Sequence, residues 1–262
     1  MKIATWNVNS IRTRKNQVLD WLKQHDVDVL CLQETKVIDD DFPRLPFEEL
    51  GYSVAVYGQK TYNGVAIVSQ KPMQSCYYGF SPLVGDDVGA AYDQQKRVIS
   101  AVVNNIRIVN VYVPNGSSVG SEKYEYKLGW FQVLKQYLQR LLTDTETEIC
   151  LCGDFNVAPE DRDIYDPAGK ENHIMASAQE RSAMEAIKSL GFQDSFRKFH
   201  AEGGQYSWWD YRTRGFARNR GWRIDHYLLT PRLYEKAISC WIDIVPRQQE
   251  RPSDHTPVIV EV

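Results

Sequence analysis

The pattern of hydrophobic and polar positions predicts short strands interrupted by a few helices. Ile3–Asn7 has the character of a strand, residues 16–22 have helical spacing, and Val27–Gln33 is a second, buried strand. Turn pairs such as Asn63-Gly64 then separate short apolar runs, a pattern typical of consecutive antiparallel strands. These runs are Tyr52–Tyr57, Gly64–Ser69, Val98–Val103 and Ile106–Val113.

The second half of the chain repeats this layout of helices and strands. A stripe of apolar residues predicts a long helix over Tyr124–Leu142, which leads into a strand that ends at Asp154. Ser177 and Glu180 form a capping box that opens another helix, and Gly191 ends it. Further strands are predicted at Tyr206–Trp209, Ile224–Thr230, Ile238–Ile244 and Pro257–Val262.

These elements predict an α/β fold with one core. Strand clusters alternate with helices, but no regular βαβ alternation runs through the chain, which favours two packed mixed sheets with helices outside. A length of 262 residues with 43% hydrophobic content is enough for one large core. We therefore expect a single domain over residues 1–262.

Charge adds a local signal to this picture. Lys plus Arg total 31 against 34 Asp plus Glu, so the net charge of -3 supplies no global attraction to nucleic acid. Residues 203–225, however, hold five arginines against two aspartates, interleaved with six aromatic residues. Cations mixed with flat rings suit a polyanion that carries bases.

The cysteines and the hydropathy of the chain indicate the cellular compartment. The five cysteines are odd in number and lack C-x-x-C spacing, which favours buried thiols in a reducing compartment. Residues 1–7 become polar before a signal-peptide core could form, and no apolar stretch approaches the length of a membrane span. We expect a cytoplasmic protein with no membrane partner.

Polar residues that directly follow apolar runs are the candidate chemical groups. Asp154 and Asn156 alternate along an extended segment and so point to one face, although this tetrapeptide alone is equally consistent with an Asx-type turn. Similar polar groups follow other runs at Glu34, Asp225 and the tripeptide 253–255. Acids and amides from several strands, with a histidine beside a carboxylate, match the needs of a hard divalent cation and a phosphate ester.

These blocks, in this order from Met1 to Val262, resemble the exonuclease III family of abasic-site endonucleases within the wider endonuclease/exonuclease/phosphatase fold. Lys36 after Glu34-Thr35, the Tyr112–Asn115 block and the Trp222–Asp225 block are similar to the DNA-repair branch. The resemblance implies a four-layered α/β sandwich and a monomer. It also implies Mg²⁺-dependent hydrolysis, with Mn²⁺ as a possible substitute.

The substrate implied by the resemblance is double-stranded DNA with abasic sites or 3′ ends. Cleavage would occur 5′ to the abasic site, accompanied by some 3′–5′ exonuclease and 3′-phosphatase activity.

The resemblance also implies a set of metal ligands. Glu34 would be the principal Mg²⁺ ligand, with Asn9 nearby and Asp254 in or beside the metal shell. Asp154 and Asn156 are further candidates at the metal. Asn9 stands where some relatives carry Asp, which bears on the tightness of metal binding.

Catalytic roles follow by the same resemblance. Asp154 would orient and deprotonate the attacking water, Asn156 would hold that water and the phosphate, and Asn7 would hold the catalytic carboxylates in position. His255, oriented by Asp225, would donate to a non-bridging phosphate oxygen. The alternative is a purely structural histidine.

DNA-contacting residues complete the implied site. Tyr112 would contact the phosphate or assist the leaving oxygen, and Asn115 would contact a phosphate. Trp208, Trp222 and Ile224 would line a pocket for an extruded abasic sugar, although tryptophans in apolar runs are more often core. Further candidates for DNA contact are Trp209, which could equally be core, and Arg212 and Arg214, which could equally be a solvated loop.

Two other functions compete with this interpretation. The same fold could hydrolyse a lipid or inositol phosphodiester or cut DNA nonspecifically, but secreted enzymes of those branches commonly carry the export signals and disulfides that this sequence does not indicate. An inactive DNA-binding module would tolerate loss of the acids, yet all of them are present.

Overall fold

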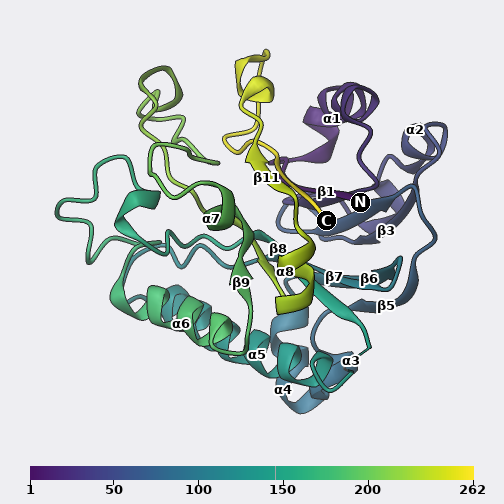
Figure 1. The fold of residues 1–262 in the computed structure, drawn as a ribbon, viewed down its shortest axis with the longest axis horizontal. Coiled ribbons are helices and arrows are strands. Elements are labelled where there is room, and N and C mark those ends of the chain that lie inside the picture. Colours follow the sequence, from purple (N-terminus) through teal and green to yellow (C-terminus); the bar gives the residue numbers. More distant parts are fainter. Residues whose placement is uncertain (145) are drawn as a thin grey trace.

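The computed structural model describes residues 1–144 and 146–262 and contains two six-stranded sheets (Figure 1). The first sheet has the order β11-β12-β1-β2-β4-β3 and the second β5-β6-β7-β8-β10-β9. The first is formed by β1 (Lys2–Asn7), β2 (Val29–Gln33), β3 (Ser53–Tyr57), β4 (Val65–Ser69), β11 (Ser239–Ile242) and β12 (Val258–Glu261). The second is formed by β5 (Gln74–Tyr78), β6 (Val98–Val103), β7 (Ile106–Tyr112), β8 (Glu148–Asp154), β9 (Gln193–Asp194) and β10 (Asp225–Leu229).

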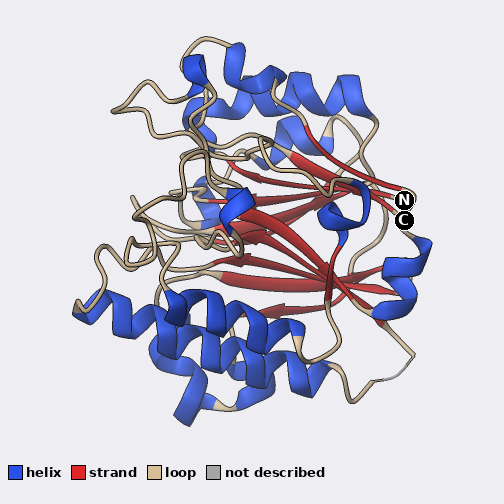
Figure 2. Cartoon of the chain, turned by 60° about the vertical axis from the view of Figure 1, so that its left-hand side comes forward, coloured by secondary structure: helices blue, strands red, loops and turns tan. Residues whose placement is uncertain are grey.

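Helices cover the outer face of each sheet, so the chain forms four layers (Figure 2). The α-helices are α1 (Ile11–His25), α2 (Arg44–Glu48), α3 (Ser81–Val84), α4 (Asp86–Asp93), α5 (Glu122–Leu141), α6 (Ala178–Lys188), α7 (Ser195–Phe199) and α8 (Pro231–Lys236). Short 3-10 helices are η1 (Asp39–Asp41), η2 (Asp161–Asp163), η3 (Phe216–Arg218) and η4 (Val245–Gln248). The predicted four-layered α/β sandwich is confirmed.

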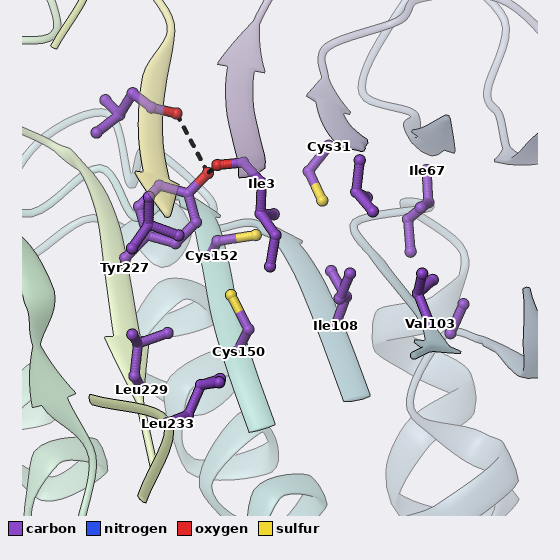
Figure 3. Close-up of a cluster of buried hydrophobic side chains, with 14 of the residues drawn as sticks. Ile3, Cys31, Ile67, Val103, Ile108, Cys150, Cys152, Tyr227, Leu229 and Leu233 are labelled. Atoms are coloured by element: carbon purple, nitrogen blue, oxygen red, sulfur yellow. Dashed lines mark hydrogen bonds between the residues drawn. The ribbon is translucent and has the colours of Figure 1, made fainter. Parts of the chain in front are cut away.

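The two sheets pack face to face through apolar side chains and several buried hydrogen bonds. Ile3, Cys31 and Ile108 are among the residues of this central core (Figure 3). Asn110 of β7 donates to the carbonyl oxygen of Leu32 at 3.0 Å and accepts a hydrogen bond from Gln33 of the first sheet at 2.7 Å. Because buried amides must be paired, these bonds fix how the two sheets are placed against each other.

Several boundaries depart from the sequence prediction. The expected strand at Tyr206–Trp209 is wrong, because only isolated bridges from Trp208 to Trp222 and His255 form there. The capping box of Ser177 and Glu180 is present at the start of α6. The segment from β5 to α4 was not predicted. The register of β5 shifts along β6, so β5 lacks a regular alternation of apolar and polar residues.

Within the described residues no helix is long and apolar enough to cross a membrane.

Candidate active site

The candidate site lies at the edge where strands of both sheets end. β1 runs parallel to β2, and β7 runs parallel to β8, so the carboxyl ends of these strands meet at one edge. Asn7 ends β1, Glu34 follows β2 and Asp154 ends β8. Asp225 follows the apolar run 222–224 and opens β10, which is antiparallel to β8 and sets Asp225 opposite Asp154. It therefore reaches the same edge from the other direction.

Sharp backbone turns aim the side chains at this edge. Asn9, Glu34 and Asn156 all have left-handed backbone conformations, with φ of 44°, 50° and 49°. This conformation costs about 1–2 kcal/mol for most residues, and asparagine tolerates it better. Gly153 has a φ of 139°, and a Cβ there would lie 2.0 Å from the carbonyl oxygen of Val111, so only glycine lets β8 pair closely with β7.

Asn7 joins the carboxylates of the two sheets. Its Nδ2 donates to Glu34 Oε1 and to Asp154 Oδ2, both at 2.9 Å. Asn7 is fully buried, so its amide is held by these bonds and cannot turn to solvent. The side chain therefore fixes the separation of a carboxylate from the first sheet and one from the second.

His255 lies between two aspartates and is almost completely buried. Its Nδ1 is 2.9 Å from Asp225 Oδ2, and its Nε2 is 3.6 Å from Asp154 Oδ2. Burial alone would lower the pKa of His255, but Asp225 and Asp154 outweigh it and raise the pKa to about 10. The ring is therefore an imidazolium near neutral pH.

Asp154 has the opposite perturbation for a carboxylic acid. Burial raises the pKa of Asp154 to about 7, with the neighbouring charge of Asp225 adding to the shift and that of His255 opposing it. Its Oδ1 accepts from the backbone N–H of Asn156 at 2.9 Å. A carboxyl group with a pKa near neutrality can both take up and release a proton at physiological pH.

Among the described residues, Glu34, Asp154 and His255 form one group that could hold a metal ion, with ligand atoms within 4.8 Å of one another. Lys36 lies against it, with Nζ 2.9 Å from Glu34 Oε2 and 2.5 Å from Asn9 Oδ1. The Lys36 ammonium shows that these two oxygens bind a positive charge. Because they are oxygen donors, they also fit a hard divalent metal ion.

Asp254 lies beside this group. Its Oδ1 accepts from Asn9 Nδ2 and its Oδ2 from Trp208 Nε1, both at 3.0 Å. The pKa of Asp254 is lowered: burial opposes this shift, but His255 and these donors outweigh it. Asp254 thus connects the carboxylate cluster to the aromatic residues described below.

Two further polar groups reach the edge from the ends of β7 and β8. Asn156 Oδ1 accepts from Asn115 Nδ2 at 3.2 Å, so these two amides meet. The guanidinium of Arg97 lies 4.4 Å from the ring centre of Tyr112. Burial, followed by the charge of Glu34, raises the pKa of Tyr112 well above its usual value, so the phenol stays protonated.

An aromatic cluster adjoins the carboxylates. Trp208 and Trp222 are half-buried and pack against a small apolar cluster that contains Ile224. The ring of Trp222 is also 5.2 Å from that of the exposed His173. Ile224 is 1% exposed and is part of the cluster against which the two indoles pack.

Trp209 does not share this position. It is 1% exposed and packs edge-on against Phe216 with ring centres 5.1 Å apart, so of its two predicted roles, core or DNA contact, the burial favours the core. Arg212 and Arg214 are exposed, as a phosphate contact requires. Arg223 is buried in ion pairs with Asp163 and Asp194, which removes one cation from the predicted basic surface.

The Arg223 network contains a neutral histidine with a consequence for stability. Burial, with Arg223 adding to it, lowers the pKa of His226 to about 4. An unfolded histidine titrates near pH 6.5, so the unfolded chain binds a proton that the folded chain excludes between pH 6.5 and pH 4. Stability contributed by this group is therefore present above pH 6.5 and is lost progressively as pH falls toward 4, by up to about 3 kcal/mol.

We predict that His226→Gln will show a shallower loss of the free energy of unfolding between pH 6.5 and pH 4, measured by urea denaturation. His173→Gln, at an exposed position, serves as the control. Equal pH slopes for His226→Gln and the wild type would contradict the assignment.

Sequence reasoning missed Arg97 and Lys127 and used Lys36 only as a family marker. Arg97 precedes β6 and stacks on Tyr112 of β7, while Lys127 lies in the middle of a helix and is fully buried. A lysine on an amphipathic helix normally marks the solvent face, so no local signal distinguishes this one.

Comparison with known proteins agrees with this geometry. The Endonuclease/Exonuclease/phosphatase family matches residues 4–255. An exodeoxyribonuclease of Bacillus subtilis is 36% identical over 264 residues, which cover 98% of each chain. The structure of an AP endonuclease from Archaeoglobus fulgidus has a TM-score of 0.92 and 41% identity, covering 100% of this chain and 98% of that one. A 3′ phosphatase from Neisseria, bound to a product DNA hairpin, has a TM-score of 0.94, 41% identity and the same coverage.

The chain therefore belongs to the Endonuclease/Exonuclease/phosphatase family. The resemblance stated from the sequence is confirmed, and within this family the protein is a phosphodiester hydrolase with the function of a DNA repair nuclease. The family is divalent-metal-dependent, and the carboxylates of Glu34 and Asp154, which lie in one group with His255, could hold such an ion.

Proposed function

We propose that the protein is a Mg²⁺-dependent endonuclease that cleaves the phosphodiester 5′ to abasic sites in double-stranded DNA. The same site would remove nucleotides or phosphates from 3′ ends. The observation that carries this proposal is the contact between the carboxylate cluster and the aromatic cluster, made by the hydrogen bond from Trp208 to Asp254. A DNA phosphate bound at the carboxylate cluster would place the adjoining sugar at the aromatic cluster.

The donor set supports magnesium as the ion. Glu34 is the proposed principal ligand, and Lys36 already indicates that its carboxylate and Asn9 attract a cation. Additional polar groups around it are Asp154, Asn156 and Asp254. Mg²⁺ prefers oxygen donors and keeps several waters, so few protein ligands suffice, and Mn²⁺ could replace it. When bound, the ion would polarise the phosphate and stabilise its developing charge.

The neighbouring residues supply proton transfer and orientation. Asp154, with its pKa raised to about 7, takes the proton of the attacking water. The imidazolium of His255 donates to a non-bridging phosphate oxygen, and Asp225 holds the ring in place through Nδ1. The amide of Asn156 orients the water and phosphate, while Tyr112, which stays protonated, donates to the phosphate or to the leaving oxygen.

The aromatic cluster supports recognition of a sugar without a base. Trp208 and Trp222 form walls of a site beside the phosphate position, and such a site accepts deoxyribose but excludes a full nucleotide by size. An abasic residue is also easily extruded, because no base pair is lost. Asn115, whose amide meets that of Asn156, is the proposed contact to the phosphate at the site, and Arg212 and Arg214 are the proposed contacts to flanking phosphates.

We also propose that the protein is a monomer in the cytoplasm. Every group of the site comes from one chain. All five cysteines are free thiols and four are buried, which supports a reducing compartment.

The proposal is tested with three duplexes, one with an abasic analogue, one undamaged and one with a 3′ phosphate, each with and without EDTA. We expect EDTA-sensitive cleavage 5′ to the abasic analogue and little internal cleavage of undamaged DNA. The 3′-phosphatase relative from Neisseria favours a second candidate, in which only the 3′ phosphate is removed. Internal cleavage of the abasic and the undamaged duplex alike would indicate a nonspecific nuclease. Binding of DNA without cleavage would indicate an inactive module.

The aromatic residues have a selective effect in this proposal. We predict that Trp222→Ala, or Trp208→Ala, will lower cleavage at an abasic site by roughly 10- to 100-fold but leave the Kd for undamaged duplex nearly unchanged. Stacking contributes about 1–3 kcal/mol per ring, and it acts only after the sugar is extruded. Kd and single-turnover rates measure the two effects, and normal cleavage by a folded Trp222→Ala variant would place the recognition site elsewhere.

Neutralising Arg212 and Arg214 together is the matched comparison. Phosphate contacts supply nonspecific affinity, so we predict weaker binding of damaged and undamaged duplexes alike. The slope of log Kd against log salt concentration should also become shallower, by about 1 for each arginine that contacts a phosphate. An unchanged salt slope would exclude these arginines from the interface.

A further inference from the structure

Lys127 is a fully buried cation inside α5, 0% exposed. Its Nζ donates to the main-chain carbonyl oxygen of Asn156 at 2.7 Å, to that of Asn115 at 3.2 Å, and to the carboxylate of Glu180. An ammonium has three hydrogens, so all its donors are directed to these three partners.

The two carbonyl groups belong to the turns that carry the amides of the active site. Asn115 follows β7 and Asn156 follows β8, and their side chains are hydrogen-bonded to each other. Asn156 has a left-handed backbone, and its Nδ2 also contacts Asp154 Oδ2 at 3.3 Å. Because Lys127 binds both carbonyls from inside the protein, it fixes the turns from which the two amides project.

Glu180 extends this link to the aromatic cluster. Its Oε2 accepts from the hydroxyl and the N–H of Ser177, and its Oε1 accepts from the N–H of Met175 at 3.0 Å. Met175 belongs to the small apolar cluster on which Trp208 and Trp222 pack. One buried ion pair therefore connects the turns of the catalytic amides to the support of the sugar site.

Stability is a weak explanation for this pair. Removing two charges from water costs about as much as their attraction returns, and apolar replacements of buried pairs are often neutral. Fixing a unique geometry is the function in which such a pair has an advantage over apolar side chains, because hydrogen bonds are directional.

We propose that Lys127 is a positioning residue of the active site, which acts through Asn115 and Asn156 and is held in register with the sugar site by Glu180. This inference rests on the proposed roles of these asparagines at the phosphate. A displacement of about 1 Å at a catalytic group can cost on the order of 10²-fold in rate. Lys127 would therefore affect kcat far more than DNA binding.

The test compares Lys127→Met with the double variant Lys127→Met/Glu180→Gln, which leaves no unpaired buried charge. We expect both folded variants to lose kcat on abasic duplex by on the order of 10²-fold, with little change in the Kd for DNA. Lys135→Met, on the same helix but away from these turns, is the control and should match the wild type.

A cycle with the asparagines distinguishes positioning from general structural support. Asn115→Ala/Asn156→Gly removes both amides but keeps the main-chain carbonyls, and glycine accepts the positive φ of position 156. In this background, adding Lys127→Met/Glu180→Gln should lower kcat by less than about threefold, because the amides that Lys127 positions are already absent. The same 10²-fold loss in both backgrounds, or full kcat in the Lys127 variants, would overturn the inference.

The outcome is separable from that of the proposed function. If the wild type does not cleave abasic duplex, the proposed substrate is wrong. The same cycle of variants is then measured on the 3′-phosphate duplex, because its phosphate would contact the same two amides. If the wild type cleaves abasic duplex while Lys127 proves silent, only the positioning role fails.

Discussion

Asp154→Asn is expected to lower kcat on abasic duplex by roughly 10³-fold or more while leaving the Kd for DNA within about twofold. Removing the base that takes the proton of water costs about 10²- to 10⁴-fold on its own. The new amide would also point N–H groups at Asn7 and His255, which already donate to this position or lie beside it, so the local electrostatics would be inverted. Single-turnover cleavage and equilibrium binding measure the two quantities separately.

The control for Asp154→Asn is Asp161→Asn, an exposed position whose partner is Arg181. This control should keep wild-type turnover. Equal losses of binding and turnover in Asp154→Asn, together with a lowered Tm, would mean that Asp154 is structural and not the base.

Glu34→Ala is expected to abolish most activity at low Mg²⁺ and to recover part of it at high Mg²⁺. Loss of residues that merely orient metal ligands already costs about 10- to 100-fold in metal affinity, so loss of a direct oxygen ligand should cost at least as much. Lys36 would also lose its partner and could no longer be held beside Asn9 in the same way. Activity as a function of Mg²⁺ concentration, with calorimetric titration of the ion, measures the shift.

Glu185→Ala, which removes an exposed carboxylate on α6, is the matched control for this experiment. Its Mg²⁺ dependence should equal that of the wild type. Activity that resists EDTA in the wild type, or an unaltered Mg²⁺ dependence in Glu34→Ala, would contradict the metal role.

These residues illustrate how far local sequence can predict a site. Glu34, Asp154 and His255 each stand at the boundary of an apolar run, so their placement at strand edges was predictable from the period of burial. The fold class followed from the same pattern, and the strands β3, β4, β6 and β7 lie within one residue of their predicted ends. Tyr206–Trp209 failed because its aromatic residues are held by Trp222 and the 253–255 turn, which are distant in sequence.

The sequence by itself determined the alternation of buried and exposed positions, the two sheets and the identity of the polar groups at their edge, because these depend on local periodicity and composition. The tertiary structure alone decided which groups touch. It set Asp225 opposite Asp154 through antiparallel pairing and buried Trp209 while leaving Trp208 beside Asp254. It also enclosed Lys127 between two loops and a distant helix. Distances, burial and the pKa values that follow from them arise from contacts between remote segments, and no local pattern in a single chain encodes them.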